Sequence, residues 1–108
     1  MNDASYHLEV SNRELTNALR QITMFKKRAG RREMMMLSSD GKRLRFTMSC
    51  VSVGVSARGT WQSDVLAPAA SIYGVARVPI NEETVRIIVD GDWLKIGSSA
   101  MRVERGAC

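Results

Sequence analysis

The stretch TVRIIVDGDWLKIGSSAMRVE, residues 84–104, decides the fold of this chain of 108 residues. Apolar residues recur along it at every second position, which is the period of a half-buried β-strand. Asp90 and Gly91 interrupt the alternation, and Gly97 begins a second interruption. Asp-Gly is a favoured hairpin pair because a type I′ turn needs positive φ at both central positions. The acidic sequence DGD is compatible with more than one loop length. The stretch therefore predicts three antiparallel strands in succession.

The composition predicts a single globular domain over residues 1–108. Hydrophobic residues make up 44% and charged residues 25% of the chain, as in ordinary globular proteins. A chain of this length buries roughly two-thirds of its unfolded surface, which is enough for one core. No apolar run approaches the roughly 20 residues of a membrane span, and the first ten residues lack the features of a secretory signal. We expect a cytoplasmic protein that does not associate with membranes.

The residues that most often carry chemistry are isolated in this sequence. Cys50 and Cys108 are the two cysteines, and they predict free thiols instead of a disulfide framework. Cys50 has no nearby histidine to generate a thiolate, and His7 has no companions at metal-ligand spacing. The glycines are too scattered to form a phosphate-cradling loop. We therefore expect no enzyme, no cofactor and no metal site.

A short strand and a helix are predicted near the N-terminus. The strand covers Tyr6 to Val10, and SNRE at 11–14 fits a capping box. In such a box the Ser11 hydroxyl caps the backbone N–H near Glu14, while the Glu14 carboxylate reaches back to the start of the helix. The residues at helical spacing that predict one buried face are Leu15, Ala18, Leu19, Ile22 and Phe25. The basic stretch KKRAGRR, 26–32, is expected to end the helix at Gly30.

The middle of the chain predicts further strands. Met34 to Leu37 is a short apolar strand, and Asp40 with Gly41 closes it in a turn. One strand face is shared by Leu44, Phe46, Met48 and Cys50, and the opposite parity by Val51, Val53 and Val55. Such a change signals a bulge, a bend or a strand break, each of which lets the chain pass between layers. Gly59 predicts a turn, and Trp61 to Leu66 predicts a weaker strand.

A second helix is expected to begin at Pro68 and to stop at Pro79. Gly74 weakens this helix by up to about 1 kcal/mol relative to alanine and predicts close packing there. The complete order is β-α-β-β-β-β-α-β-β-β, without βαβ alternation. It predicts an α+β fold in which two helices pack on one face of an antiparallel sheet.

Three patches carry a resemblance to a known family. They are SDGKRLRFTMSCVSVGVSA (39–57), VLAPAASIYGVARVPINEETVRIIV (65–89) and DGDWLKIGSSAMRVE (90–104). With the order of elements, they resemble one domain of a DNA sliding clamp of the bacterial beta type over residues 5–104. The first patch is similar to the family's acidic turn and following strands, the second to its proline-led helix and strand, and the third to its closing strands. The sequence departs from the family at Cys50, where an aspartate is usual, and in lacking a proline at 32–34.

The resemblance implies a function as well as a fold. Members of the family join two or three such domains in one chain and close a ring of six around duplex DNA. Helices that carry lysine and arginine form the inner wall of the ring, and sheets form the outer wall. The resemblance therefore implies a processivity or tethering factor for DNA replication, with replication or repair proteins as further partners. A lone domain would have to self-associate through sheet edges, as a ring, a dimer or an open arrangement.

The basic residues match this function. The net charge of +5 and the sequence pI near 9.8 favour polyanionic partners. The candidate contacts to the phosphate backbone of double-stranded DNA are Arg13, Arg20, Lys26, Lys27, Arg28, Arg31, Arg32 and Arg77. Arg13, Arg20 and Lys27 fall on the outward stripe of the first helix, and Arg77 lies on the second. Such contacts are sequence-neutral and salt-sensitive. An ordinary solvated helix surface is the alternative interpretation of these residues.

Two further interpretations stay open. One is a protein-interaction adaptor with a clamp-like fold and no DNA binding, and the other is an unrelated small α+β domain. Trp61 and Trp93 would anchor an interface or cover the outer sheet, and stacking of one of them on a base is the third alternative. Met34, Met35 and Met36 are expected to fill a core or an interface, because methionine adapts to irregular gaps.

Overall fold

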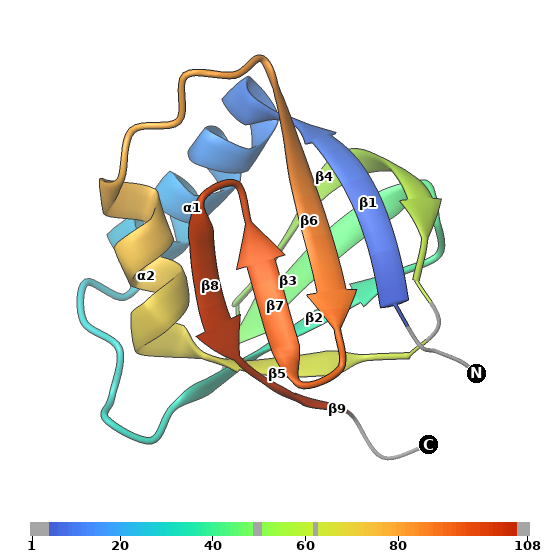
Figure 1. Cartoon of the computed structure of the whole chain (residues 1–108). Helices are drawn as coiled ribbons and strands as arrows, with labels where there is room; N and C mark the ends of the chain where they lie inside the picture. Colours follow the sequence, from blue (N-terminus) through green and yellow to red (C-terminus); the bar gives the residue numbers. More distant parts are fainter. Residues whose placement is uncertain (1–4, 49–50, 62, 106–108) are drawn as a thin grey trace.

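The computed structural model describes residues 5–48, 51–61 and 63–105, and a curved antiparallel sheet forms most of it (Figure 1). The strands are β1 (Ser5–Ser11), β2 (Met34–Ser39), β3 (Arg43–Met48), β4 (Val51–Thr60), β5 (Val65–Pro68), β6 (Thr84–Asp90), β7 (Trp93–Ile96), β8 (Ser99–Arg102) and β9 (Glu104–Arg105). The helices are α1 (Asn12–Phe25) and α2 (Ala69–Arg77). The predicted α+β class and order of elements are confirmed, with the two-residue β9 added at the end.

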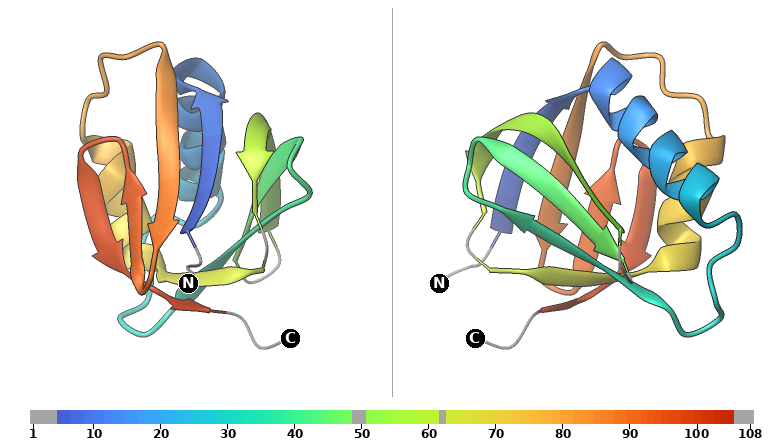
Figure 2. Two further views of the ribbon diagram at one scale, coloured as in Figure 1. Left: turned by 45° about the vertical axis from the view of Figure 1, so that its right-hand side comes forward. Right: turned by 180° about the vertical axis from the view of Figure 1, so that it is seen from behind.

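The sheet wraps into a nearly closed barrel. Its strand order is β8-β7-β6-β1-β4-β3-β2-β5-β9, and every pairing is antiparallel. Val103 alone separates β8 from β9, so the two ends of this order belong to almost the same strand. Both helices lie at one side of this barrel and pack against each other (Figure 2). The antiparallel sheet expected from the sequence is therefore present, and it is strongly curved.

The strand pairing reveals an internal repeat. The units β1-α1-β2-β3-β4 and β5-α2-β6-β7-β8 have the same order, and each lends its first strand to the other, as β1 pairs with β6 and β5 with β2. In the first unit β4 bends: its residues 51–56 pair with β3 and its residues 57–60 with β1. In the second unit β8 pairs with β7 and β9 pairs with β5. The two helices therefore occupy equivalent places in the barrel.

The start of α1 follows half of the predicted capping box. The Ser11 hydroxyl oxygen accepts a 3.4 Å hydrogen bond from the Glu14 backbone N–H, as expected. The Glu14 carboxylate was predicted wrongly to reach back, because its Oε1 accepts a 2.9 Å hydrogen bond from the Ser56 N–H of β4 instead. The strand β4, which is distant in sequence, thus binds the Glu14 carboxylate that the capping box would have used.

The end of α1 differs from the prediction. The helix stops at Phe25, and Lys26 already has an extended backbone with φ −138°, so Gly30 does not terminate it. Leu15, Ala18, Leu19 and Ile22 are buried as predicted. Phe25 is 59% exposed instead, because the chain leaves the helix immediately after it.

The barrel interior and the inner faces of the helices form one core. The predicted inward faces of β3 and of the closing strands are confirmed, since Leu44, Phe46, Met48, Val85, Ile87, Val89, Leu94, Ile96 and Met101 are buried. The parity change is a strand break, with β3 ending at Met48 and β4 beginning at Val51. Cys50, predicted to share the inward face, lies outside the described residues, as does Cys108. Met35 is fully buried, whereas Met34 and Met36 are half-buried.

Gly59 was predicted to make a turn, but it lies inside β4 opposite Leu8. Its φ is +143°, and a Cβ there would overlap the carbonyl oxygen of His7. Glycine is required because β4 and its pairing partner β1 approach each other very closely at this point. The strand expected from Trp61 begins only at Val65, and the Trp61 indole N–H donates a 3.4 Å hydrogen bond to the Leu37 carbonyl.

The second helix and the closing hairpins follow the sequence more closely. Pro68 precedes the first helical residue of α2, and the helix ends at Arg77, before Pro79. The expected close packing at Gly74 is wrong, since a Cβ there would meet nothing within 4 Å. The cross-strand pair of Asp90 with Trp93 leaves a two-residue hairpin loop in which Gly91 has φ +62°. Neither of the described helices has the length and apolarity needed to cross a bilayer.

Candidate nucleic-acid interface

One side of α1 faces α2 across a groove. Residues three or four positions apart lie on the same side of a helix, so Thr16, Arg20 and Thr23 form one stripe along α1. Lys27 follows the end of α1 and extends this stripe, although it was predicted to lie within the helix. Since Leu15, Leu19 and Ile22 hold the opposite side of α1 in the core, the stripe is turned outward.

The groove brings together cations from both helices. Its volume is about 210 Å³, and its walls are Thr16, Arg20, Thr23, Lys27, Tyr73, Ala76 and Arg77. Arg20, Lys27 and Arg77 are exposed, and within the described part of the chain the structure gives none of the three an ion pair. Guanidinium, ammonium and hydroxyl groups are the donors that proteins offer to phosphate oxygens. The groove is therefore suited to a phosphate group.

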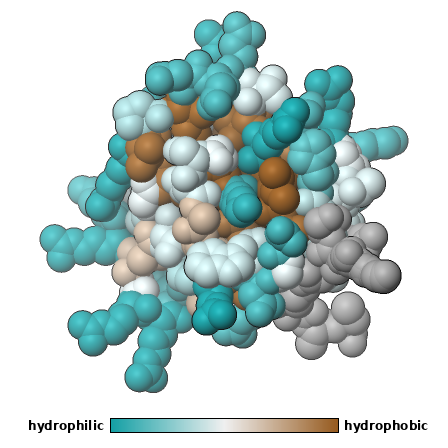
Figure 3. Space-filling view, viewed as in Figure 1, coloured by the Kyte–Doolittle hydropathy of each residue, from teal (hydrophilic) through white to brown (hydrophobic). Residues whose placement is uncertain are grey.

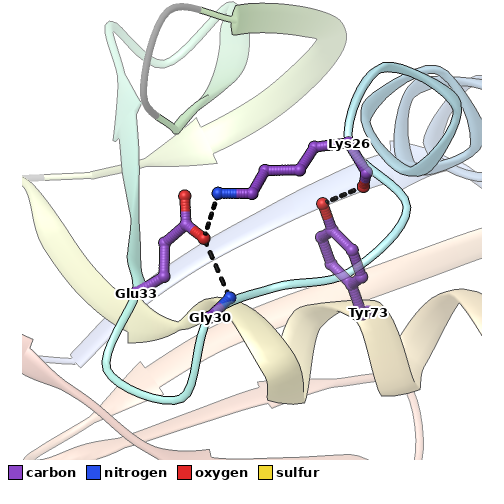
Figure 4. Close-up of polar contacts among 4 residues, drawn as sticks. All are labelled: Lys26, Gly30, Glu33 and Tyr73. Atoms are coloured by element: carbon purple, nitrogen blue, oxygen red, sulfur yellow. Dashed lines mark hydrogen bonds and ion pairs between the residues drawn. The ribbon is translucent and has the colours of Figure 1, made fainter.

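Tyr73 forms the floor of the groove and connects the two helices. Its hydroxyl donates a 2.6 Å hydrogen bond to the carbonyl oxygen of Lys26, the C-cap residue of α1 (Figure 4). Burial raises the pKa of Tyr73, the negative charge of Glu33 raises it further, and the positive charge of Lys26 opposes them. The hydroxyl therefore stays protonated and remains a donor across the physiological pH range. It satisfies one of the carbonyl groups that the last turn of a helix leaves without a partner.

The segment 26–33, which we name the basic loop, is fixed by Glu33. The Glu33 Oε1 atom accepts a 2.8 Å contact from Lys26 Nζ and a 3.0 Å hydrogen bond from the Gly30 N–H (Figure 4). The Glu33 carbonyl accepts a 2.9 Å hydrogen bond from Ala69 N–H at the start of α2. The basic loop is thus tied to both helices, and it presents its remaining cations on a defined backbone.

The structure separates the eight predicted DNA contacts into four groups. Arg20, Lys27 and Arg77 meet in the groove. Lys26 is engaged by Glu33, which offsets its charge. The other exposed cations of the basic loop are Arg28, Arg31 and Arg32, which follow Lys27 within the next five residues. Arg13 lies two helical turns before Arg20, roughly 10 Å along the axis, and lines a different concavity.

That second concavity is larger, with a volume of about 950 Å³, and lies at the start of α1 between β1, β4 and the segment 81–84. Its lining includes four carboxylates and two guanidinium groups: Glu9, Glu14, Glu82, Glu83, Arg13 and Arg58. The Asn12 side chain within it donates a 2.7 Å hydrogen bond to the Ile80 carbonyl and accepts one from the Thr16 hydroxyl. Because carboxylates outnumber cations, this concavity repels polyanions, and it is a weaker candidate for DNA than the helix groove.

Sequence reasoning missed four members of the groove, Thr16, Thr23, Tyr73 and Ala76. Thr16 and Thr23 occur at the same helical spacing as Arg20, so the stripe itself was a sufficient signal for them. Tyr73 carried no such signal, because its position against Lys26 depends on how α2 packs on α1. The exposure of Met24 and Phe25 beside the cations was also not predicted.

Comparison of the chain with family models, with characterised proteins and with solved structures gives no significant match.

Proposed function

We propose that this protein is a clamp-like, sequence-nonspecific DNA-associated factor that self-associates and tethers other proteins to duplex DNA. The observation that carries the proposal is the groove in which Arg20 and Lys27 from the α1 side meet Arg77 from α2. Two helices on one side of an antiparallel barrel, with their cations turned outward, support the resemblance to one domain of a sliding clamp. The internal repeat of β-α-β-β-β units supports it as well.

The chemistry of the groove suits a tether that moves along DNA. Each cation that neutralises a phosphate releases a condensed counterion, so affinity comes from entropy and depends strongly on salt. The groove offers hydroxyl and cationic groups to phosphates, which are the same at every base pair. The protein would consequently hold duplex DNA without stopping at any one sequence.

Free strand edges support self-association. Within the described residues, the 51–56 part of β4 pairs only with β3, and β8 pairs only with β7. The Ser56 N–H points away from β3 to Glu14, so the N–H groups of Ser52 and Gly54 point to the same open side. The internal repeat makes the β4 and β8 edges equivalent. Pairing of β4 in one copy with β8 in the next is head-to-tail, and it produces either a ring or an open chain.

The experiment compares retention on covalently closed circular and linear duplex DNA at low salt. The groove variant Arg20→Gln, Lys27→Gln, Arg77→Gln is expected to lose most of its affinity for both substrates. A matched variant, Arg45→Gln, Arg86→Gln, Lys95→Gln, removes the same charge from exposed positions on the outer sheet and should bind nearly as well as the wild type. If both variants bind equally, or if the wild type ignores both substrates, the proposal fails.

A second function, a protein-interaction adaptor without DNA binding, is favoured by the outer face of β6, β7 and β8. Trp93 is 47% exposed there, and the Arg102 guanidinium carbon lies 5.9 Å from its ring centroid. Apolar and hydrophilic side chains lie side by side on this face (Figure 3). Tryptophan and arginine are the residues most enriched at the energetic centres of protein interfaces. A chain that is monomeric and indifferent to duplex DNA at low salt would favour the adaptor.

A further inference from the structure

The last two residues of α1 are large apolar side chains that face solvent. Met24 is 74% exposed and Phe25 is 59% exposed, and they are adjacent in the chain. Phe25 follows Ile22 of the core at helical spacing, so it continues the core side of α1 to the exposed end of the helix, whereas Met24 follows Arg20 on the outward side. An exposed aromatic ring beside a methionine is a contact surface of limited size.

Cations surround this apolar pair in the chain. Arg20 precedes Met24 by one helical turn, and the basic loop follows Phe25 directly. The exposed cations of this region are Arg20, Lys27, Arg28, Arg31 and Arg32, and the structure gives none of them an ion pair with another described residue. The positive charge of these residues favours a polyanionic ligand. The apolar pair Met24 and Phe25 favours a polyanion that also exposes flat apolar groups. Unpaired nucleobases on a phosphate backbone satisfy both requirements.

We propose that Met24 and Phe25 form a stacking surface for unpaired bases, which gives the protein a higher affinity for single-stranded than for duplex nucleic acid. This inference rests on the proposed function, because the phosphates of the same strand would lie on Arg20 and Lys27. Arg20 lines the groove, Met24 follows it one helical turn later on the same side of α1, and Phe25 is the next residue and the last of the helix. Duplex DNA keeps its bases stacked inside, so it can use only the cations.

A membrane surface fits the region less well. A helix that lies on a bilayer inserts a broad apolar face between its charged flanks. In α1 that face is already buried against the barrel, since Leu15, Ala18, Leu19 and Ile22 belong to the core. Two of the neighbouring cations, Arg20 and Lys27, moreover line a concave groove, which follows a strand better than a flat sheet of head groups.

The test uses a 20-nucleotide oligothymidylate and a 20-base-pair duplex at equal ionic strength. Phe25→Ala is expected to weaken oligothymidylate binding by about 5- to 150-fold, as for the loss of one base–aromatic stack, with duplex affinity changed less than about twofold. Phe25→Trp should restore binding, and its fluorescence should be quenched by the oligonucleotide. Trp93→Ala, on the outer sheet, is the matched control and should bind both substrates as the wild type does.

Several results would overturn the inference. The inference is wrong if Phe25→Ala leaves the affinity for oligothymidylate unchanged, or if it lowers the affinities for oligothymidylate and duplex equally. Binding of phosphatidylserine vesicles that depends on Phe25, without oligothymidylate binding, would reassign the surface to a membrane. These results also separate the inference from the tethering function. If the protein binds duplex and Phe25→Ala changes neither affinity, only this inference is wrong. If the protein binds oligothymidylate through Phe25 and does not bind duplex, the inference is correct and the proposed duplex tether is wrong.

Discussion

The Tyr73 hydroxyl of α2 lies 2.6 Å from the carbonyl oxygen of Lys26, the C-cap residue of α1. This hydrogen bond joins the two helices at the point where the basic loop begins. It thereby fixes the position of Lys27 at one end of the groove and Arg77, four residues after Tyr73, at the other. The geometry of the candidate DNA site thus depends on a contact between residues 47 positions apart.

Removal of this hydrogen bond should weaken both the fold and the groove. Tyr73→Phe keeps the ring in the core but leaves the Lys26 carbonyl without its donor, and we expect a loss of about 1 kcal/mol in the free energy of unfolding. Urea denaturation measures this loss, and the same variant should bind duplex DNA more weakly than the wild type. An unchanged unfolding midpoint would show that water replaces the hydroxyl without cost.

The same residue predicts a dependence of stability on alkaline pH. Because burial raises the pKa of Tyr73, the folded state holds the phenolic proton more tightly than the unfolded state does. The stabilisation is fully present below the ordinary tyrosine pKa of about 10, and it is lost as the pH rises through the higher folded-state value. The difference in unfolding free energy between wild type and Tyr73→Phe should therefore shrink at strongly alkaline pH. A difference that grows there would contradict the assignment.

Gly59 should not tolerate a side chain. Gly59→Ala would add a Cβ that overlaps the His7 carbonyl oxygen, at a backbone φ of +143° and at the point where β4 pairs with β1. We expect a loss of at least about 3 kcal/mol in unfolding free energy, because both the overlap and the backbone strain act on rigid backbone. Thermal denaturation of the purified variant measures this loss. A melting temperature within a few degrees of wild type would contradict the close approach of β4 to β1.

Gly74 should respond to the same substitution with the opposite sign. A Cβ at Gly74 meets nothing within 4 Å, and its φ is not positive. Gly74→Ala in α2 is therefore expected to stabilise the protein by up to about 1 kcal/mol, since alanine loses less backbone entropy in a helix. Urea unfolding measured beside Gly59→Ala makes the two glycines controls for each other. Destabilisation by Gly74→Ala would mean that α2 packs more closely than the structure shows.

The strand-edge interface can be tested with one proline. The Ser52 N–H is expected to point away from β3, so Ser52→Pro should leave the β3–β4 pairing intact while it blocks addition of a strand at the open edge. Sedimentation velocity should show weaker self-association for Ser52→Pro than for Ser52→Ala, which loses the same 3.2 Å hydroxyl contact to Thr47. Equal self-association of the two variants would exclude this edge.

The sequence predicted the features that depend on neighbours along the chain. The alternation of Val85, Ile87 and Val89, with glycines at 91 and 97, was sufficient for the closing hairpins. The helical spacing from Leu15 to Ile22 was sufficient for the buried side of α1. In each case the local period already determines which side chains share a face.

Features that depend on distant contacts could not be predicted in this way. Glu14 leaves its own helix end because Ser56 offers a strand N–H, and Gly59 is required by the approach of His7. The end of α1 at Phe25 goes together with the capture of the Lys26 carbonyl by Tyr73 from α2. The candidate site was consequently predicted as a list of cations, whereas the meeting of Arg20, Lys27 and Arg77 in one groove needed the packing of two helices.

The most direct test of the central claim is the salt dependence of duplex DNA binding. A plot of the logarithm of the association constant against the logarithm of salt concentration has a slope of about −0.9 for each phosphate neutralised. For Arg20→Gln, Lys27→Gln, Arg77→Gln, the slope should be less steep than for wild type by about 2 to 3, while the outer-sheet variant Arg45→Gln, Arg86→Gln, Lys95→Gln keeps the wild-type slope. Equal slopes for all three proteins would contradict phosphate binding in the helix groove.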